Sequence, residues 1–238
     1  MTELQDIWVY LSASPLLHLT LTLAAFQCGT WIYAKANLNP LLNPVLIAVV
    51  LIVGILLTTQ TSYQDYFEGA QFVHFLLGPA TVALAIPLYR QFDRVRGSAI
   101  SIITSIITGS LTAITSAIGI GYLLSASDEA LVSLAPKSIT APVAMGITEQ
   151  LGGLPSLTAV LVIVTGVLGA MIGPFVLNLI GVKDWQARGL AMGTASHGIG
   201  TARALQVNEV AGAFSGLAMG LNALATAILL PIIWQLLF

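Results

Sequence analysis

The chain alternates long apolar segments with short polar ones. A helix needs roughly 17–25 residues to cross a hydrocarbon core of about 30 Å. Apolar segments of this length lie at 16–34, 41–58, 72–89, 99–124, 157–180 and 214–237. The pattern therefore predicts an all-α polytopic membrane protein.

Two further segments are less apolar and carry Pro, Gly, Ser and Thr where a membrane helix would carry Leu and Val. Irregular backbone at membrane depth is tolerated only where protein or water covers it. We predict two broken helices, either re-entrant hairpins or full crossings, which gives about six to eight transmembrane helices. The expected organisation is a single integral membrane domain over 1–238, which begins with N-terminal helices at 1–124. A first hairpin (131–150) and the span after it occupy 131–180. A second hairpin (189–206) and the span after it occupy 189–237.

Composition supports this class of protein. With 57% hydrophobic and only 8% charged residues, the chain cannot cover itself with an ordinary soluble surface. A net charge of −2 without a basic stripe excludes an electrostatic nucleic-acid-binding face. The single cysteine, Cys28, allows no disulfide within the chain. The first 34 residues hold no Lys or Arg, so we expect no cleavable signal peptide.

Charge placement predicts the orientation, because Lys and Arg near span ends favour the cytoplasmic face. Basic residues follow the first and third spans and the span at 157–180, whereas the acidic loops near 65 and 128 hold no Lys or Arg. The N-terminus is then outside, and segment 131–150 must enter and leave on one face as a re-entrant hairpin. The basic residues concerned are Lys35, Arg90, Arg94, Arg96, Lys183 and Arg188.

The two polar segments resemble each other. Residues 138–153 and 197–212 share four residue types at positions that are 60 residues apart, and each leads into a long apolar span. If both segments are re-entrant, the single span between them gives the second copy the opposite orientation in the membrane. The pattern then predicts an inverted repeat with a substrate site where the broken segments meet. Similar composition alone is the alternative. The matched pairs are Ile139 with Ile199, Ala144 with Ala204, Glu149 with Glu209, and Gly152 with Gly212.

The second polar segment, GTASHGIGTARALQ, carries the most candidate chemistry. A central Arg costs roughly 2.5–3.5 kcal/mol on insertion scales, so an intramembrane cation indicates a function. We expect a helix to begin after Gly200, with its amides and Arg203 facing a small anion. His197 is a candidate for contact with a substrate hydroxyl or for carrying a coupling proton, and a structural histidine is the alternative. The hydroxyls of Thr194, Ser196 and Thr201 complete this half of the predicted site.

The first polar segment places a cation between two prolines, in APKSITAP. Proline removes a backbone donor, so nearby carbonyls and hydroxyls are free to face a ligand. Lys137, Ser138 and Thr140 are the candidates here, and a lysine that reaches the membrane interface is the alternative for Lys137. Thr81, Glu149 and Glu209 are weaker candidates for the pathway or for coupling, and solvated carboxylates are the simpler interpretation of the two glutamates.

No enzyme, cofactor or metal-binding signature occurs in the sequence, so we expect neither catalysis nor a bound cofactor or metal.

Over its whole length the chain resembles the LrgB/CidB family of bacterial inner-membrane proteins, whose plant relatives include the plastidial glycolate/glycerate translocator. The likeness is strongest in FLLGPATVALAIPLYRQ (75–91), LAPKSITAPVAMGITEQLGG (134–153) and GTASHGIGTARALQVNEVAGAFSGLAMG (193–220). The resemblance implies either exchange of small 2-hydroxy acids or holin-like modulation of murein hydrolase export and lysis with an LrgA/CidA-type partner. It also implies the inner membrane as location.

The broken, cationic segments favour transport. The leading hypothesis is a secondary transporter of small monocarboxylates (glycolate, glycerate, lactate or pyruvate) that works by alternating access, and we expect a homodimer. The holin-like or antiholin-like regulator is the alternative.

Overall fold

The computed structural model describes residues 15–76, 79, 82–83 and 85–237, and all regular secondary structure in them is helical. The candidate Thr81 lies outside the described residues. The chain forms two compact units, Met1–Ala83 and Leu84–Phe238, and each is described by itself.

The first unit contains α2 (Pro15–Lys35), the short 3-10 helix η1 (Pro40–Leu42), α3 (Pro44–Thr59) and α4 (Tyr63–Phe75). Asn43 starts α3 by accepting the Val45 amide at 2.8 Å, the bond expected of a helix N-cap. His18 is buried with its ring edge against Tyr66, and the Tyr66 hydroxyl is 2.9 Å from that of Thr22. These contacts join α2 to α4.

The continuous span predicted at 72–89 is wrong for the residues described. Helix α4 ends at Phe75 and Leu76 is a turn, whereas Pro79, Val82, Ala83 and the six-residue helix α6 that begins at Ala85 are helical.

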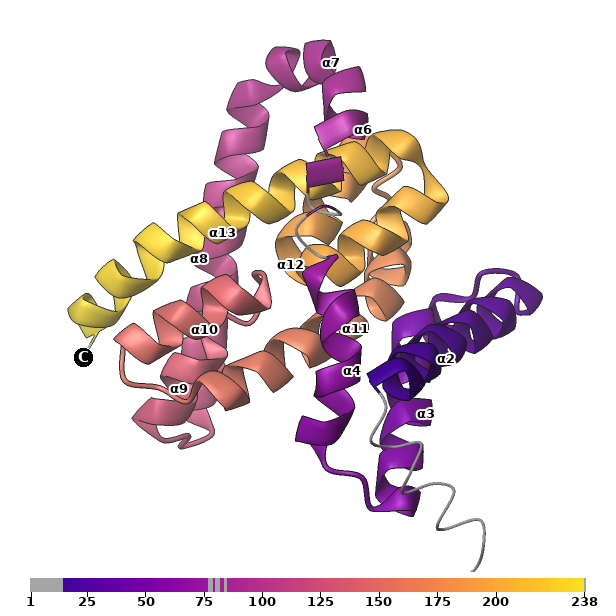
Figure 1. Cartoon of the computed structure of the whole chain (residues 1–238). Helices are drawn as coiled ribbons and strands as arrows, with labels where there is room; N and C mark the ends of the chain where they lie inside the picture. The colour runs from indigo at the N-terminus through magenta and orange to yellow at the C-terminus, as the bar shows by residue number, and fades with distance from the viewer. Residues whose placement is uncertain (1–14, 77–78, 80–81, 84, 238) are drawn as a thin grey trace, which may run out of the picture. The chain divides into compact units, whose positions relative to one another are not determined.

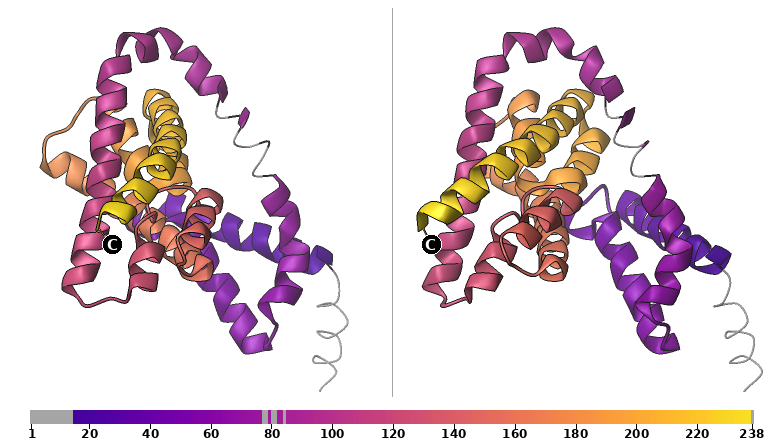
Figure 2. Two further views of the ribbon diagram at one scale, coloured as in Figure 1. Left: turned by 90° about the vertical axis from the view of Figure 1, so that its left-hand side faces the viewer. Right: turned by 60° about the vertical axis from the view of Figure 1, so that its left-hand side comes forward.

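The second unit is built from eight described helices. Figure 1 shows α13 passing obliquely across α8, and Figure 2 shows α8 as a long rod between α7 and α9. The helices are α6 (Ala85–Arg90), α7 (Phe92–Gly97), α8 (Ala99–Leu123), α9 (Asp128–Leu134), α10 (Ala141–Gln150), α11 (Pro155–Leu179), α12 (Trp185–Val207) and α13 (Glu209–Leu237).

Four helices of the described residues are long and apolar enough to cross a membrane: Pro40–Thr59, α8, α11 and α13. They match four of the predicted spans, which makes the protein an all-α membrane protein. Helix α2 matches a fifth predicted span in its bounds, but polar residues such as His18 and Gln27 lower its hydropathy. The predicted total of six to eight crossings stays a prediction.

The first polar segment folds as two short helices, α9 and α10, joined by a turn at 135–140. Three hydroxyl residues tie it to the start of α11. Ser133 Oγ accepts the Leu154 amide at 2.8 Å, and Thr158 donates to the Ser133 carbonyl at 3.0 Å. Thr148 lies 2.9 Å from Thr158, and all three side chains are buried. The predicted break is present, and these hydroxyls serve the packing of the hairpin.

The second polar segment is broken at His197, which has φ 40° and ψ −132° inside α12. A Cβ added to Gly200 would lie 2.6 Å from the carbonyl oxygen of Met192, eight residues earlier. Eight residues of continuous helix rise by about 12 Å, so the chain folds back on itself at His197. The second half of α12 therefore begins just after His197, three residues earlier than the expected start after Gly200.

The order of helices repeats. The matched pairs of the sequence, such as Glu149 with Glu209, are 60 positions apart, and the same offset places His197 opposite Lys137 in the turn of the first hairpin. Each copy runs short helix, break, short helix and long apolar helix: α9, α10 and α11, then the two halves of α12 and α13. The inverted relation between the copies stays a prediction.

Candidate functional site

Helix α12 is the centre of the second unit, and glycines let its neighbours approach closely. An added Cβ on Gly169 of α11 would overlap Ser196 Oγ, and one on Gly166 would lie 2.6 Å from His197 Nε2. A Cβ on Gly193 of α12 would overlap the Ser215 carbonyl of α13, and one on Gly109 of α8 would lie 2.8 Å from Thr194. Three helices thus pack against the polar residues of α12.

A groove with a volume of about 790 Å³ runs between α8 and α12. Ser138, from the turn of the first hairpin, and Thr194, from the second broken segment, line it together. The two polar segments therefore meet, as the sequence pattern predicted. The groove is the candidate functional site of the described residues.

Helix α8 supplies one wall of this groove with a row of hydroxyls. Their spacings of three and four residues place them on one face of the helix. Isoleucines occupy the positions between them: Ile102, which also lines the groove, and Ile106 are buried, whereas Ile103 and Ile107 are exposed. We call this row the hydroxyl stripe; it comprises Ser98, Ser101, Ser105, Thr108 and Thr112.

Asn222 of α13 holds the inner end of the groove together. Its Nδ2 donates to the carbonyl of Thr194 at 2.9 Å and to that of Ser138 at 3.3 Å, and its Oδ1 accepts from Ser110 Oγ. Its side chain is 1% exposed, and every donor and acceptor of its amide has a partner. One buried amide thus links α8, α13 and both broken segments.

The break at His197 makes this bond possible. In a continuous helix the Thr194 carbonyl would accept the amide of residue 198, four positions later. His197 interrupts the helix between them, which frees the carbonyl for Asn222. The His197 ring is buried, and its Nε2 donates to the Val162 carbonyl of α11 at 2.9 Å. The geometry supports the structural interpretation of this histidine.

Ser196 and Thr201 lie beside His197 and face the packed interior. Thr201 donates to the His197 carbonyl at 2.9 Å and lies 3.0 Å from the Ser215 hydroxyl, so it closes the turn after the break. Ser196 is 1% exposed against Gly169, and its Oγ has no hydrogen-bond partner in the described residues. Neither residue lines the groove.

The predicted cations do not line the groove either. Lys137 is half-buried in the turn of the first hairpin, directly before the groove residue Ser138. Arg203 lies in the second half of α12, and its Nε and Nη1 are shielded from solvent. Thr140 is the N-cap residue of α10, with a half-buried side chain that makes no capping bond.

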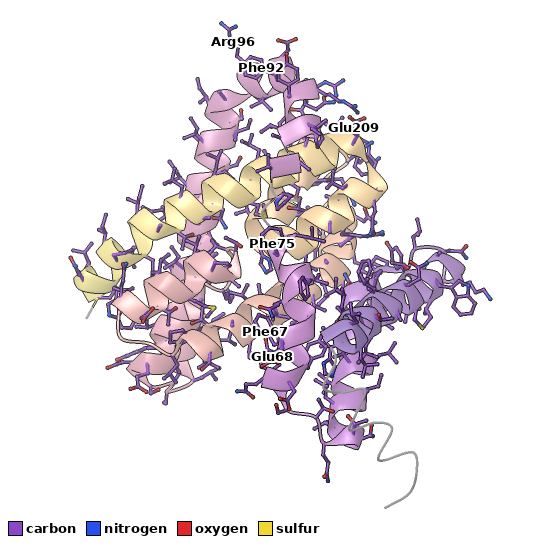
Figure 3. All side chains as sticks on the ribbon, viewed as in Figure 1. Phe67, Glu68, Phe75, Phe92, Arg96 and Glu209 are labelled. Atoms are coloured by element: carbon purple, nitrogen blue, oxygen red, sulfur yellow. The ribbon has the colours of Figure 1, made fainter. Side chains whose placement is uncertain are left out.

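The two candidate glutamates lie away from the groove. Glu149 is exposed in the last turn of α10. Glu209 is exposed at the start of α13 and pairs with Arg90 at 3.2 Å. Figure 3 shows Glu209 at the same end of the unit as Phe92 and Arg96. Both positions suit solvated carboxylates, the simpler of the two interpretations of the sequence.

The mouth of the groove lies where α8 and α12 begin. Ser98 Oγ donates to Gln186 Oε1 at 3.4 Å across it. Asp184 also lines the mouth and caps α12 by accepting the Ala187 amide at 2.9 Å. Arg188 fixes the preceding turn through bonds of 2.8 Å to Asn178 Oδ1 and to the Val182 carbonyl. The Ser98–Gln186 contact brings the segments before α8 and α12 together, and the predicted orientation in the membrane stays a prediction.

Sequence reasoning missed the hydroxyl stripe and Asn222. The stripe has a visible signal, since Ser and Thr recur at spacings of three and four within an apolar span. The matching signal for Asn222 is an amide side chain near the middle of the apolar segment 214–237. A polar side chain there needs a partner within the protein, but its identity depends on the tertiary contacts. In the described residues, no group of three or more His, Cys, Asp or Glu side chains is placed to hold a metal.

The fold and groove define the class: a helical integral membrane protein with a polar groove between broken helices. The chain belongs to the LrgB-like family, whose sequence profile matches residues 22–236. It is 36% identical over 224 residues to the holin-like protein CidB of Staphylococcus epidermidis, covering 94% of this chain and 96% of that protein.

Two further relatives come from Bacillus subtilis. The chain is 34% identical over 227 residues to the antiholin-like protein LrgB, covering 94% of this chain and 96% of that protein. It is 39% identical over 189 residues to the uncharacterized protein YwbG, covering 79% of this chain and 84% of that protein. No solved structure matches this chain. Similarity over nearly the full length assigns the family, which the sequence motifs had indicated.

Proposed function

We propose that this protein carries small monocarboxylates, in particular 2-hydroxy acids such as glycolate, glycerate and lactate, across the membrane by alternating access. The observation that carries the proposal is the groove in which the two broken segments meet. Ser138 and Thr194 line its inner end, and the hydroxyl stripe of α8 lines its length. The α8 hydroxyls lie on an exposed side of an otherwise apolar helix, where they can replace part of the hydration that a small anion loses on entry.

The hydroxyls of α8 differ in what they offer a solute. Thr108 and Thr112 each donate to a backbone carbonyl at 2.7 Å, so their oxygens are left as acceptors. In the described part of the chain the hydroxyls of Ser101 and Ser105 have no protein acceptor, so they are free to donate. A 2-hydroxy acid needs both kinds of group: donors for its carboxylate and an acceptor for its hydroxyl.

A cation is the strongest partner for a carboxylate. Lys137 is the candidate closest in sequence to the inner end, because it precedes Ser138. We retain Arg203 as a second candidate from the other broken segment. For His197 we propose a positioning role, through its bond to Val162 and the backbone break, in place of direct contact with the solute. We propose no enzymatic activity.

Binding to the purified protein tests the proposal. Glycolate, glycerate, lactate and pyruvate should each raise the thermal unfolding temperature in a saturable manner, with acetate as the control that lacks a 2-oxygen. The shift should weaken in S105A and K137A if each folds as the parent does. Saturable counterflow of labelled glycolate in liposomes should show the same losses. A protein that binds none of the four acids and transports none would exclude the proposal.

A second candidate function is supported by the names of the relatives. Proteins similar over nearly the whole chain are named holin-like and antiholin-like. By this proposal the protein modulates murein hydrolase export and cell lysis together with an LrgA/CidA-type membrane partner. It predicts co-purification with such a partner and a lysis phenotype on deletion that S105A fully complements. The transport proposal predicts that S105A complements poorly.

The remaining proposals concern location and assembly. We propose the bacterial inner membrane, with the basic loops in the cytoplasm and the N-terminus outside, since Lys and Arg favour that side. We also propose that the two copies of the hairpin-plus-span unit are related by an inverted repeat and that the protein forms a homodimer. Tagging the two termini and measuring protease access from each side would test the orientation.

A further inference from the structure

The groove extends along α8 from its first turn to beyond its middle. Ser98 and Thr112, at the two ends of the hydroxyl stripe, are 14 residues apart. At 1.5 Å per residue this separation is roughly 21 Å. Helix α8 is long and apolar enough to cross a membrane, and the hydrocarbon core is about 30 Å thick. The stripe thus spans more than half of the distance that α8 would cross.

Beyond Thr112 the interior becomes apolar. Ile114 and Ile118 of α8 form a buried cluster with Ile139 and Ile147 of the first hairpin. We call these four residues the isoleucine barrier; each is at most 6% exposed. A charged solute cannot enter such a cluster without losing its hydration and gaining no hydrogen bond in exchange. None of these four residues lines the groove, and the cluster holds no polar side chain that would continue the polar route.

Basic residues flank the other end of the groove in the sequence, although none of them lines it. Arg94 and Arg96 of α7 come directly before Ser98, and Lys183 and Arg188 flank the mouth residues of α12. The contact between Ser98 and Gln186 brings these two segments together. A cluster of cations at the entrance of a cleft raises the local concentration of anions. Asp184 is the opposing charge among the residues that line the mouth.

We propose that this groove is a water-filled half-path for a small anion, open at the basic end and closed at the isoleucine barrier. The identity of the anion rests on the proposed function, whereas the water access does not. Alternating access would then require the barrier to separate between Ile114 and Ile118 on α8 and Ile139 and Ile147 on the first hairpin. The groove corresponds to a state that is open to one side only.

Cysteine accessibility tests this proposal, because Cys28 is the single cysteine and C28S gives a cysteine-free background. Single cysteines are placed in the stripe (S101C, S105C and T108C), on the exposed apolar face of the same helix (I103C and I107C) and in the barrier (I114C). The full-length protein is reconstituted in vesicles and treated from each side with a negatively charged, membrane-impermeant methanethiosulfonate. If a stripe variant unfolds at a temperature well below that of C28S, its cysteine is moved to the neighbouring position of the stripe.

The stripe cysteines should react at least about tenfold faster than I103C, I107C and I114C, since only a hydrated thiol forms the reactive thiolate. They should react with reagent from one side only. Equal rates on the two faces of α8, or no reaction in the stripe, would overturn the proposal. Reaction of I114C at the rate of T108C would overturn the closed barrier. If the stripe reacts but saturating glycolate, lactate and pyruvate do not slow it, the half-path stands and the proposed substrate class fails.

Discussion

Asn222 Nδ2 donates to the carbonyl oxygen of Thr194 at 2.9 Å, and the same amide group also reaches the Ser138 carbonyl. These two carbonyls belong to the two breaks in the helices, 56 residues apart in the chain. A single buried side chain of α13 therefore sets the distance between the two segments that line the inner end of the groove.

Replacing Asn222 by leucine or aspartate should destabilise the protein, because neither side chain can donate to both carbonyls. We expect a loss of about 1 kcal/mol for each bond removed, since a buried carbonyl is left without a partner and polar contacts in membrane proteins are of this order. Thermal unfolding in detergent measures it. A double-mutant cycle with S110A isolates the Ser110–Asn222 bond. An N222L protein as stable as the parent would show that the link is not needed.

Replacing Gly169 by alanine should destabilise the packing of α11 on α12, because the added Cβ would overlap Ser196 Oγ. Overpacking in a tight interior costs roughly 1–3 kcal/mol. The S196A change removes the overlapping oxygen, so the G169A/S196A protein should recover part of the loss. Gly119 of α8 is the matched control, with nothing within 4 Å of an added Cβ. G119A should be neutral or stabilising by up to about 1 kcal/mol.

Two substitutions at His197 test the break in α12. The backbone there has φ 40°, a conformation that glycine adopts more readily than other residues. H197G and H197A both lose the bond to Val162, but H197G should be the more stable by about 1 kcal/mol because it avoids the strain. A continuous helix would give the opposite order, with alanine favoured by about 1 kcal/mol. Chemical or thermal unfolding of the two variants decides between these structures.

The Arg90–Glu209 pair should contribute little to stability. The two side chains are 66% and 54% exposed, and exposed pairs of this kind are worth about 1 kcal/mol or less. We expect E209Q and R90Q to shift the unfolding temperature by similar small amounts, with no further loss in the double variant. The shift in unfolding temperature caused by either substitution should shrink as the salt concentration is raised. A large and salt-independent loss in E209Q alone would indicate a second partner for this carboxylate.

Much of the architecture follows from local sequence features. The apolar lengths predicted α8, α11 and α13 within a few residues, because a membrane-spanning helix is set by its own hydropathy and length. Pro136 and Pro142 predicted the turn between α9 and α10 in the same way. In the second polar segment a helix was predicted to begin after Gly200, but the break occurs at His197. The ring bond to Val162 and the close packing on α11 stabilise a conformation that histidine seldom adopts alone.

By itself the sequence determined the class of protein, the positions of the long helices, the two polar breaks and the family. These properties depend on composition, spacing and motif, which are readable along the chain. Only the tertiary structure decided which polar groups share the groove. It placed Ser138 and Thr194 beside the hydroxyl stripe, joined them through Asn222, and left Lys137 and Arg203 outside the lining. The physical reason is that a buried polar group is satisfied by whichever helix packs against it, and that partner can lie anywhere in the chain.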